Sequence, residues 1–232
     1  MNDYRDFGYY FDDITSEIDY MDWFDFTKPY INEKSKILDL ACGSLTFAII
    51  LKTYGYDVSG LDLSKSMLEV GHEKAKMNHL DIPIYNMDMT DFNIDKKFNC
   101  ITCFFDSLNH LPTKELVEKT FDMVDKHLED NGVFLLDIFS EYAYKNSVGT
   151  KSEEVSSCSY DWTIDIKEPN ILHHNIIIHT FDEDIVENYY EYYYPLELFI
   201  NDPRFVVQQI SGDFLDTCDE SSGRIILALR KR

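Results

Sequence analysis

Short apolar runs alternate along residues 36–139 with stretches in which apolar residues recur three and four positions apart. The short runs are apolar at consecutive positions, which is typical of strands buried on both faces of a parallel sheet. The longer stretches have the period of amphipathic helices that cover such a sheet. The pattern predicts strands at 36–41, 56–63, 82–88, 97–106 and 133–139, and helices at about 45–54, from 64 onward and at 113–128.

The pattern changes between residues 140 and 195, where no helical period remains. Runs at 159–166, 171–181 and 185–194 are separated by turn-forming residues. Such runs predict long antiparallel strands joined by tight connections. We therefore expect an inserted antiparallel β meander over 140–195, which covers the substrate site.

Two further runs, 204–210 and 224–230, predict a β-hairpin that completes the main sheet. Residues 31–139 and 196–232 would then form one domain around the insertion. The expected fold class is α/β, with a doubly wound, seven-stranded sheet whose last strand is antiparallel.

The first 30 residues are rich in aromatic side chains, and the apolar positions 20, 23, 24 and 27 suit an amphipathic helix. Two compatible interpretations follow. The segment covers the sheet, or residues 1–30 form a helical lid over a ligand site. In the second interpretation Tyr10 and Trp23 are candidates for substrate contact.

Composition and charge narrow the possible partners. Hydrophobic residues make up 44% of the 232 residues, which is enough for a packed core. Lysine and arginine number 21 against 43 aspartate and glutamate, a net charge of −22. Such a field repels phosphate backbones and anionic lipids, so we expect neither a nucleic-acid nor a membrane partner.

The five cysteines are an odd number, and the N-terminal residues do not resemble a signal peptide. We therefore expect a cytoplasmic protein with free thiols. Cys100 and Cys103 form a Cys-x-x-Cys pair, but on a strand they would point to opposite faces. His173, His174 and His179 have no carboxylate or thiol at ligand spacing, and no metal site is expected.

The first predicted strand–helix turn is the expected ligand site, because ligands bind at the carboxyl ends of strands in open α/β sheets. Asp39 ends the strand, and the small residues Ala41 and Gly43 precede a helix whose N–H groups are unpaired. Asp62 follows nineteen residues after Gly43 and is suited to accept hydrogen bonds from a ribose diol. These residues predict an adenosine-type ligand. A dinucleotide is disfavoured, because its G-x-G-x-x-G turn is missing.

The run ILDLACGSLTFAIILKTYGYDVSGLDLSKSMLEVGHEKA, from residue 37, resembles motifs I and II of class I S-adenosylmethionine-dependent methyltransferases. The resemblance continues through Asp88-Met89, the FDSLNH segment at 105–110 and Asn131-Gly132, and covers about Tyr4 to Phe139. The FFDSLNHL and LLDIFS segments and the tyrosine-rich insertion are similar to a bacterial group of small-molecule methyltransferases. The resemblance implies a Rossmann-like sheet and S-adenosylmethionine as cofactor.

The resemblance also implies roles for single residues. The backbone of Ala41 and Gly43 would hold the methionine portion, and Asp62 the ribose. The other implied cofactor contacts are Leu63 and Met67 beside the adenine, Asp88 and Met89 at its edge, Phe105, and Asp39 in the same crevice.

Two residues depart from the family pattern in places that bear on the cofactor. Leu45 replaces the third glycine of motif I, which can narrow the turn or shift the methionine portion. Phe11 stands where relatives often have a tyrosine, so Tyr10 would have to supply the hydroxyl.

The predicted function is methyl transfer to N or O of a small-molecule acceptor by in-line displacement. Asp106 and His110 are the candidate bases, although Asp106 can equally cap a turn and His110 can be an ordinary loop residue. Asn109 and Tyr192 are candidate substrate contacts, although the tyrosines at 189–194 are also explained by a half-buried sheet face.

Other functions stay open. The imperfect motif I is compatible with a catalytically inactive protein that binds S-adenosylmethionine in a regulatory or partner role. An NAD-linked oxidoreductase would use the same strand–turn–helix arrangement, but it is less favoured because the glycines of a dinucleotide-binding turn are missing. The protein is expected to be a monomer or a homodimer.

Overall fold

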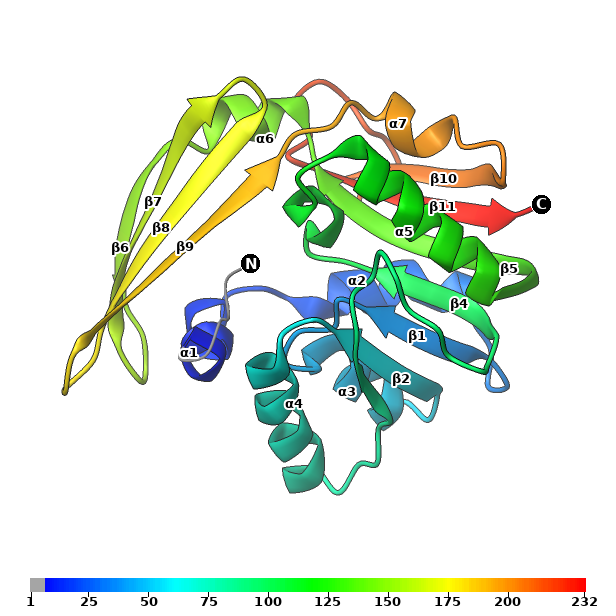
Figure 1. Cartoon of the computed structure of the whole chain (residues 1–232), viewed down its shortest axis with the longest axis horizontal. Helices are drawn as coiled ribbons and strands as arrows, with labels where there is room; N and C mark the ends of the chain where they lie inside the picture. Colours follow the sequence, from blue (N-terminus) through cyan, green and yellow to red (C-terminus); the bar gives the residue numbers. More distant parts are fainter. Residues whose placement is uncertain (1–6) are drawn as a thin grey trace.

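The structure, a computed structural model, describes residues 7–232. The first six positions, including Tyr4 and the start of the predicted lid at 1–30, lie outside the described residues. Two sheets make up the framework: a seven-stranded sheet with helices on both faces, and a separate four-stranded sheet (Figure 1). No described helix is both long enough and apolar enough to cross a membrane.

The seven-stranded sheet has the strand order β10-β11-β5-β4-β1-β2-β3. Its strands are β1 (Lys36–Leu40), β2 (Asp57–Asp62), β3 (Ile84–Asn86), β4 (Phe98–Cys103), β5 (Leu128–Phe139), β10 (Phe205–Gly212) and β11 (Arg224–Lys231). The first five strands pair in parallel, and β11 pairs antiparallel with both of its neighbours. The predicted seven-stranded, doubly wound sheet with its last strand antiparallel is confirmed.

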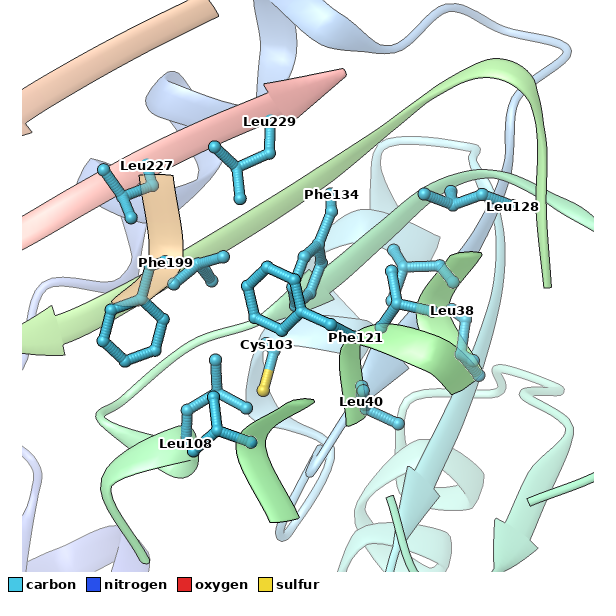
Figure 2. Close-up of a cluster of buried hydrophobic side chains, with 14 of the residues drawn as sticks. Leu38, Leu40, Cys103, Leu108, Phe121, Leu128, Phe134, Phe199, Leu227 and Leu229 are labelled. Atoms are coloured by element: carbon cyan, nitrogen blue, oxygen red, sulfur yellow. The ribbon is translucent and has the colours of Figure 1, made fainter. Parts of the chain in front are cut away.

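Both faces of this sheet are buried, which explains why its strands are apolar at consecutive positions. On one face, α5 (Lys114–His127) and the short α7 (Glu197–Ile200) cover the strands. Phe121 of α5 meets Phe134 of β5 edge-on, with 5.3 Å between ring centroids (Figure 2). Cys103 lies in this cluster and Cys100 in the cluster of the other face, as the strand period predicted.

The second face is covered by α3 (Thr46–Thr53) and α2 (Tyr20–Thr27), with a contribution from α4 (Lys65–Met77). Asp19 caps α2 by accepting a hydrogen bond from the Met21 N–H. Trp23, Phe24 and Phe26 of α2 are buried in this cluster. The prediction of an amphipathic helix over the sheet is therefore met by α2.

The inserted sheet has four strands in chain order: β6 (Gly149–Glu154), β7 (Ser159–Glu168), β8 (Ile171–His179) and β9 (Asp184–Tyr192). The sequence predicted three of them and missed β6, whose six residues are all polar or glycine and nearly all exposed. It also missed α6 (Glu141–Asn146), a short helix that buries no residue. Neither element has the apolar period that sequence patterns detect.

The turn that joins β1 to α3 keeps a special backbone despite its unusual sequence. Ala41, Gly43 and Leu45 have φ values of 57°, 51° and 62°, so every position at which the family pattern has glycine is left-handed. This conformation disfavours residues that have a Cβ atom. The Leu45 side chain is fully buried beneath the turn.

Two glycines make room for Leu45. A Cβ atom added at Gly60 would lie 2.5 Å from Leu45 Cδ2, and one added at Gly71 would lie 2.7 Å from Leu45 Cγ. The bulky residue therefore packs into space that β2 and α4 leave open. We conclude that Leu45 fills the core below the turn.

We expect the Leu45→Gly variant to lose about 3 kcal/mol of unfolding free energy, because the cavity outweighs the relief of backbone strain. The Ala41→Gly variant should change the unfolding free energy by less than about 1 kcal/mol, since strain relief and added chain entropy offset each other. Urea denaturation of both variants measures the difference. A Leu45→Gly variant as stable as the wild type would contradict this account of the turn.

Candidate active site

The carboxyl ends of β1 and β2 hold the two acidic residues that the sequence assigned to a cofactor. Asp39 is buried at the end of β1, and its Oδ1 accepts a hydrogen bond of 2.7 Å from Thr102 Oγ1. Burial raises the pKa of Asp39 to about 7, and the nearby Asp62 carboxylate adds to the rise. Asp39 is thus a carboxyl group whose charge state changes near neutral pH.

Asp62 and the predicted turn meet directly. Its Oδ2 accepts a 2.8 Å hydrogen bond from the Gly43 N–H, and its Oδ1 accepts one of 2.8 Å from the Ser64 N–H. Burial raises the pKa of Asp62, while these backbone donors lower it. Each carboxylate oxygen keeps a second lone pair, so Asp62 is fixed in place and can still accept hydrogen bonds.

The remaining predicted cofactor residues lie around this pair. Met67 packs between Gly43 and Gly8, with the Met67 Cε 3.2 Å from the position of a Cβ added at Gly43. Leu63 is 46% exposed next to Asp62. The Asn86 side chain donates to the Asp62 and Leu63 carbonyl oxygens, so the ends of β2 and β3 are held together.

Asp88 and Met89 follow β3 and have local contacts. Asp88 Oδ1 accepts hydrogen bonds from both the N–H and the hydroxyl of Thr90, each at 2.8 Å. Met89 packs against the core cluster beneath α5. In this structure Asp88 therefore stabilises a turn, and its other oxygen remains for a ligand.

Helix α1 (Phe7–Ile14) is held onto the turn by a polar network that the sequence did not reveal. Asp12 Oδ1 accepts a 2.6 Å hydrogen bond from Ser44 Oγ, and Asp12 Oδ2 lies 2.5 Å from Lys74 Nζ. Lys74 also donates to Ser44 and to Thr46. We call these four residues the α1 latch.

The other side of α1 faces the inserted sheet. Tyr10 and Phe11 pack against an apolar cluster that includes Tyr160, Ile176 and Ile178 of that sheet. The structure thus places Tyr10 between the two sheets. Helix α1 is a bridge from the first strand–helix turn to the insertion, which Figure 1 shows as the isolated helix between them.

Asp137 of β5 organises the neighbouring part of the crevice. It is completely buried, and its Oδ1 accepts a 2.9 Å hydrogen bond from the Asp106 N–H. Its Oδ2 accepts bonds of 2.8 Å from both Trp23 Nε1 and Arg224 Nη1. One carboxylate therefore joins the loop after β4, helix α2 and strand β11.

Asp106, a predicted base, stands on strained backbone at this junction. Phe105 and Asp106 have φ values of 60° and 57°, and such strain often marks functional sites. Arg224 binds both oxygens of Asp106, at 2.7 and 3.0 Å. Burial raises the pKa of Asp106, the Arg224 charge lowers it, and the charges of Asp137 and Glu191 raise it further.

The predicted substrate contact at Trp23 needs correction. The side chain is 6% exposed, its N–H is bonded to Asp137, and its ring packs 4.4 Å from that of Phe105. Trp23 therefore supports the loop that carries Phe105 and Asp106. Phe105 itself remains partly buried between Trp23 and Tyr20 at the crevice.

Glu191 of β9 comes close to two histidines. Its Oε2 lies 3.1 Å from His174 Nε2, and its Oε1 lies 3.6 Å from His110 Nε2. Burial alone would raise the pKa of Glu191, but the two histidines and Arg224 lower it overall. Burial lowers the pKa of His110, against the effect of Glu191, so His110 is neutral near pH 7.

A cavity of about 340 Å³ opens beside Asp106 and beneath the inserted sheet. Charged side chains face it from β9, β11 and the loops after β4 and β10, and the apolar lining comes from β5 and β8. Its principal lining residues are Asp106, Phe139, Leu172, His174, Glu191 and Arg224. The cavity is the candidate acceptor site.

The predictions for Tyr192 and Asn109 also change. Strand pairing puts Glu191 opposite Leu172, on the face that lines the cavity, and therefore puts the Tyr192 side chain on the other face. The Asn109 side chain is fully buried and donates a 2.9 Å hydrogen bond to the Tyr192 carbonyl oxygen. These two residues connect the loop after β4 to the insertion, and Glu191 takes the place that the sequence gave to Tyr192.

Sequence reasoning named Asp106 but missed the other residues that line the candidate acceptor cavity, as well as Asp137, and only some of these left a signal. Asp137 interrupts the apolar run VFLLDIF, and Arg224 begins RIILALR. A charge within a strand that is buried on both faces marks an internal ion pair or a site. His174 on β8 and Glu191 on β9 lie in strands with alternating polar residues, where no such contrast exists.

Comparisons with known proteins agree with this geometry. Residues 37–132 match the family model of a methyltransferase domain. A protein of Geobacillus sp. (strain WCH70) named "Putative methyltransferase" is 27% identical over 247 residues, which cover 98% of this chain and 99% of that protein.

Two further relatives bear on the fold and the substrate. A crystal structure of an S-adenosylmethionine-dependent methyltransferase from Clostridium acetobutylicum has a TM-score of 0.86 at 24% identity and covers 99% of both chains. The dTDP-3-amino-3,4,6-trideoxy-alpha-D-glucopyranose N,N-dimethyltransferase of Streptomyces venezuelae is 33% identical over 106 residues, covering 45% of this chain and 43% of that protein. The family resemblance is confirmed, the fold is that of these methyltransferases, and the neighbours support S-adenosylmethionine as the cofactor.

The Asp137→Asn variant should lose about 3 kcal/mol of unfolding free energy, because an amide has one acceptor oxygen for donors that use both carboxylate oxygens and no charge to pair with Arg224. Urea denaturation measures the loss. Asp165→Asn, an exposed aspartate on β7, is the control and should be nearly neutral. Equal stability of the two variants would contradict the organising role of Asp137.

The Asp39→Asn variant should be more stable than the wild type at pH 8, by about 4 kcal/mol. The folded pKa of Asp39 is raised to about 7, so the wild type loses stability as pH rises from about 4 to 7. Below pH 4 the carboxyl is protonated in both states, and the difference should vanish. Denaturation at several pH values tests this, and a difference that is independent of pH would contradict it.

Proposed function

We propose that this chain, whose residues 37–132 match a methyltransferase domain, transfers a methyl group from S-adenosylmethionine to an amine nitrogen of a small molecule bound in the cavity beside Asp106. One observation carries the proposal: the cofactor-type turn at Gly43 and Asp62 and an acidic cavity share the same edge of the sheet. The relative from Streptomyces venezuelae, named for an amino sugar, supports nitrogen as the target.

The residues at the turn fit S-adenosylmethionine in chemical terms. Asp62 has lone pairs for a ribose diol, and the ionised form of Asp39 suits the ammonium of a methionine portion. A ligand without phosphate does not require the three glycines of a dinucleotide turn. When bound, the cofactor supplies a methyl group on a positively charged sulfur.

The charge of the cavity favours a cationic acceptor. Asp106, Glu191 and Asp213 line it, and among the described lining residues Arg224 is the one lysine or arginine. Arg224 is already paired with Asp106 and Asp137. The remaining field attracts an ammonium ion and repels phosphates and carboxylates.

The chain's contribution to methyl transfer is to position, desolvate and deprotonate the acceptor. An ammonium must first lose a proton, after which the nitrogen lone pair forms the C–N bond while the C–S bond breaks and its electrons stay on sulfur. His110 is neutral near pH 7 and can take that proton. Asp106 is bound at both oxygens by Arg224 and is therefore less suited than His110 to take that proton.

We also propose that helix α1 is the mobile lid within residues 1–30 and that residues 140–195 cover the acceptor. The α1 latch fastens the helix to the turn, and Tyr10 and Phe11 contact the inserted sheet. Four polar side chains hold a helix of only eight residues. Such a short, polar attachment suits an element that opens and closes.

The inactive-protein alternative rests on the imperfect motif I, in which Ala41 and Leu45 replace glycines. The Leu45 side chain lies below the turn in space left by Gly60 and Gly71. All three turn positions have a left-handed backbone, which favours the active enzyme over the inactive protein.

Calorimetric titration with S-adenosylmethionine, S-adenosylhomocysteine and NAD tests the cofactor. We expect the first two to bind and Asp62→Ala to weaken them by about 10- to 100-fold, the effect of losing charge-assisted hydrogen bonds. Asp57→Ala, at the other end of β2 and half-exposed, is the matched control. Binding of NAD alone, or equal binding to both variants, would contradict the proposal.

Methyl transfer to a panel of small amines, alcohols and carboxylic acids tests the acceptor class. We expect amines to be methylated and His110→Gln to lower kcat by about 100-fold with unchanged S-adenosylhomocysteine binding, because it removes a general base. The exposed His72→Gln variant should retain full activity. Transfer to alcohols alone, or full activity of His110→Gln, would contradict this assignment.

A further inference from the structure

His174 has a buried ring nitrogen whose hydrogen bonding is incomplete. The residue is 4% exposed and lines the candidate acceptor cavity. Its Nε2 lies 3.1 Å from Glu191 Oε2, but among the described residues it forms no hydrogen bond of good geometry. A buried nitrogen whose contact with a carboxylate is poorly aligned costs folding free energy, so its presence at a cavity points to a ligand that completes the bond.

The surroundings of His174 determine which nitrogen carries the proton. Trp162 Nε1 donates a 3.1 Å hydrogen bond to His174 Nδ1. An indole nitrogen can only donate, so Nδ1 must be the unprotonated acceptor and Nε2 must carry the hydrogen. The Tyr189 ring stacks on the imidazole at 4.5 Å and 15°, which fixes its plane. His174 therefore presents an N–H donor at the cavity.

Glu191 presents the complementary acceptor. Both residues line the cavity, and the Glu191 side chain is 12% exposed. Burial raises the pKa of Glu191, but the contact with His174 and the charge of Arg224 lower it overall, so the carboxylate is ionised at neutral pH. A directed donor and a charged acceptor thus stand side by side, and each has hydrogen-bonding capacity left.

The chemistry of this pair restricts what can bind. A hydroxyl group can accept from the His174 N–H and donate to Glu191 at the same time. An ammonium cannot accept, and a phosphate or carboxylate cannot donate and is repelled by Glu191. The second oxygen of Glu191 can receive an ammonium carried on the next carbon atom.

We propose that His174 and Glu191 are specificity-determining residues of the acceptor cavity and that they select small amines with a hydroxyl on the neighbouring carbon. The inference rests on the proposed function only in calling the ligand a methyl acceptor. It assigns the recognition of the acceptor to the inserted sheet, since β8 and β9 supply both residues.

Nuclear magnetic resonance of the full chain, labelled with ¹⁵N in histidine, tests the tautomer. His174→Phe identifies the signals of His174. We expect an unprotonated Nδ1 and a protonated Nε2 in the wild type, and a mixture of tautomers in Trp162→Phe, which lacks the indole donor. A wild-type His174 protonated at Nδ1 would overturn the proposal.

Ligand binding tests the selectivity without relying on methyl transfer. The probes are an aminocyclohexanol with its two groups on neighbouring carbons, cyclohexylamine and cyclohexanol, each titrated calorimetrically. We expect the amino alcohol to bind about ten-fold more tightly than either single-group compound, as one hydrogen bond to a charged pair predicts. His174→Phe and Glu191→Gln should each abolish the difference.

His173→Phe is the matched control, because His173 neighbours His174 on β8 and points to the opposite face. It should keep the preference for the amino alcohol. Equal binding of the three probes to the wild type, or a preference that survives in His174→Phe, would overturn the inference. Failure of the proposed function would instead show as amino-alcohol selectivity without methyl transfer.

Discussion

The buried carboxylate of Asp137 is the interaction on which the candidate active site depends. A charge in the middle of a sheet that is covered on both faces is costly unless donors surround it. Here the donors come from the loop after β4, from α2 and from β11. These segments are far apart in the sequence, and their hydrogen bonds to the same carboxylate fix their positions relative to one another. The strained backbone of Phe105 and Asp106 persists because this anchor holds it.

The first strand–helix turn has a backbone that favours glycine but a sequence in which two of the three positions are not glycine. Its three left-handed residues include an alanine and a leucine, where glycine would avoid the strain. The turn keeps its shape because Leu45 gains a buried site between Gly60 and Gly71. Ala41 and Leu45 thus occupy two of the turn positions, while Gly60 and Gly71 lie in the elements beneath. A comparison of sequences alone finds only one of the three motif glycines in this turn, although the backbone at all three positions is left-handed.

What the sequence could predict follows from which interactions are local. The seven-stranded sheet was predictable, because strands buried on both faces are apolar at every position. The exposed edge strand β6 and the short α6 were not, since neither buries an apolar side. Asp39 was proposed from its place at the end of a strand and Asp62 from its spacing after Gly43, whereas the sequence pointed to Tyr192 and not to Glu191, which lines the cavity. The choice between neighbours on a strand depends on which face meets the cavity, and that depends on pairing with Leu172.

The two halves of the candidate site are specified in different ways. The candidate cofactor side consists of the left-handed turn and the carboxylates of Asp39 and Asp62. Because these lie within one continuous segment, the sequence alone can predict their chemistry. The candidate acceptor side uses side chains from β5, β8, β9 and β11, which meet only where the inserted sheet joins the main sheet. Such a surface can change its substrate through substitutions on the inserted strands while the turn and Asp137 remain as they are. Helix α1 contacts both halves, so a change at either side acts on the same short helix.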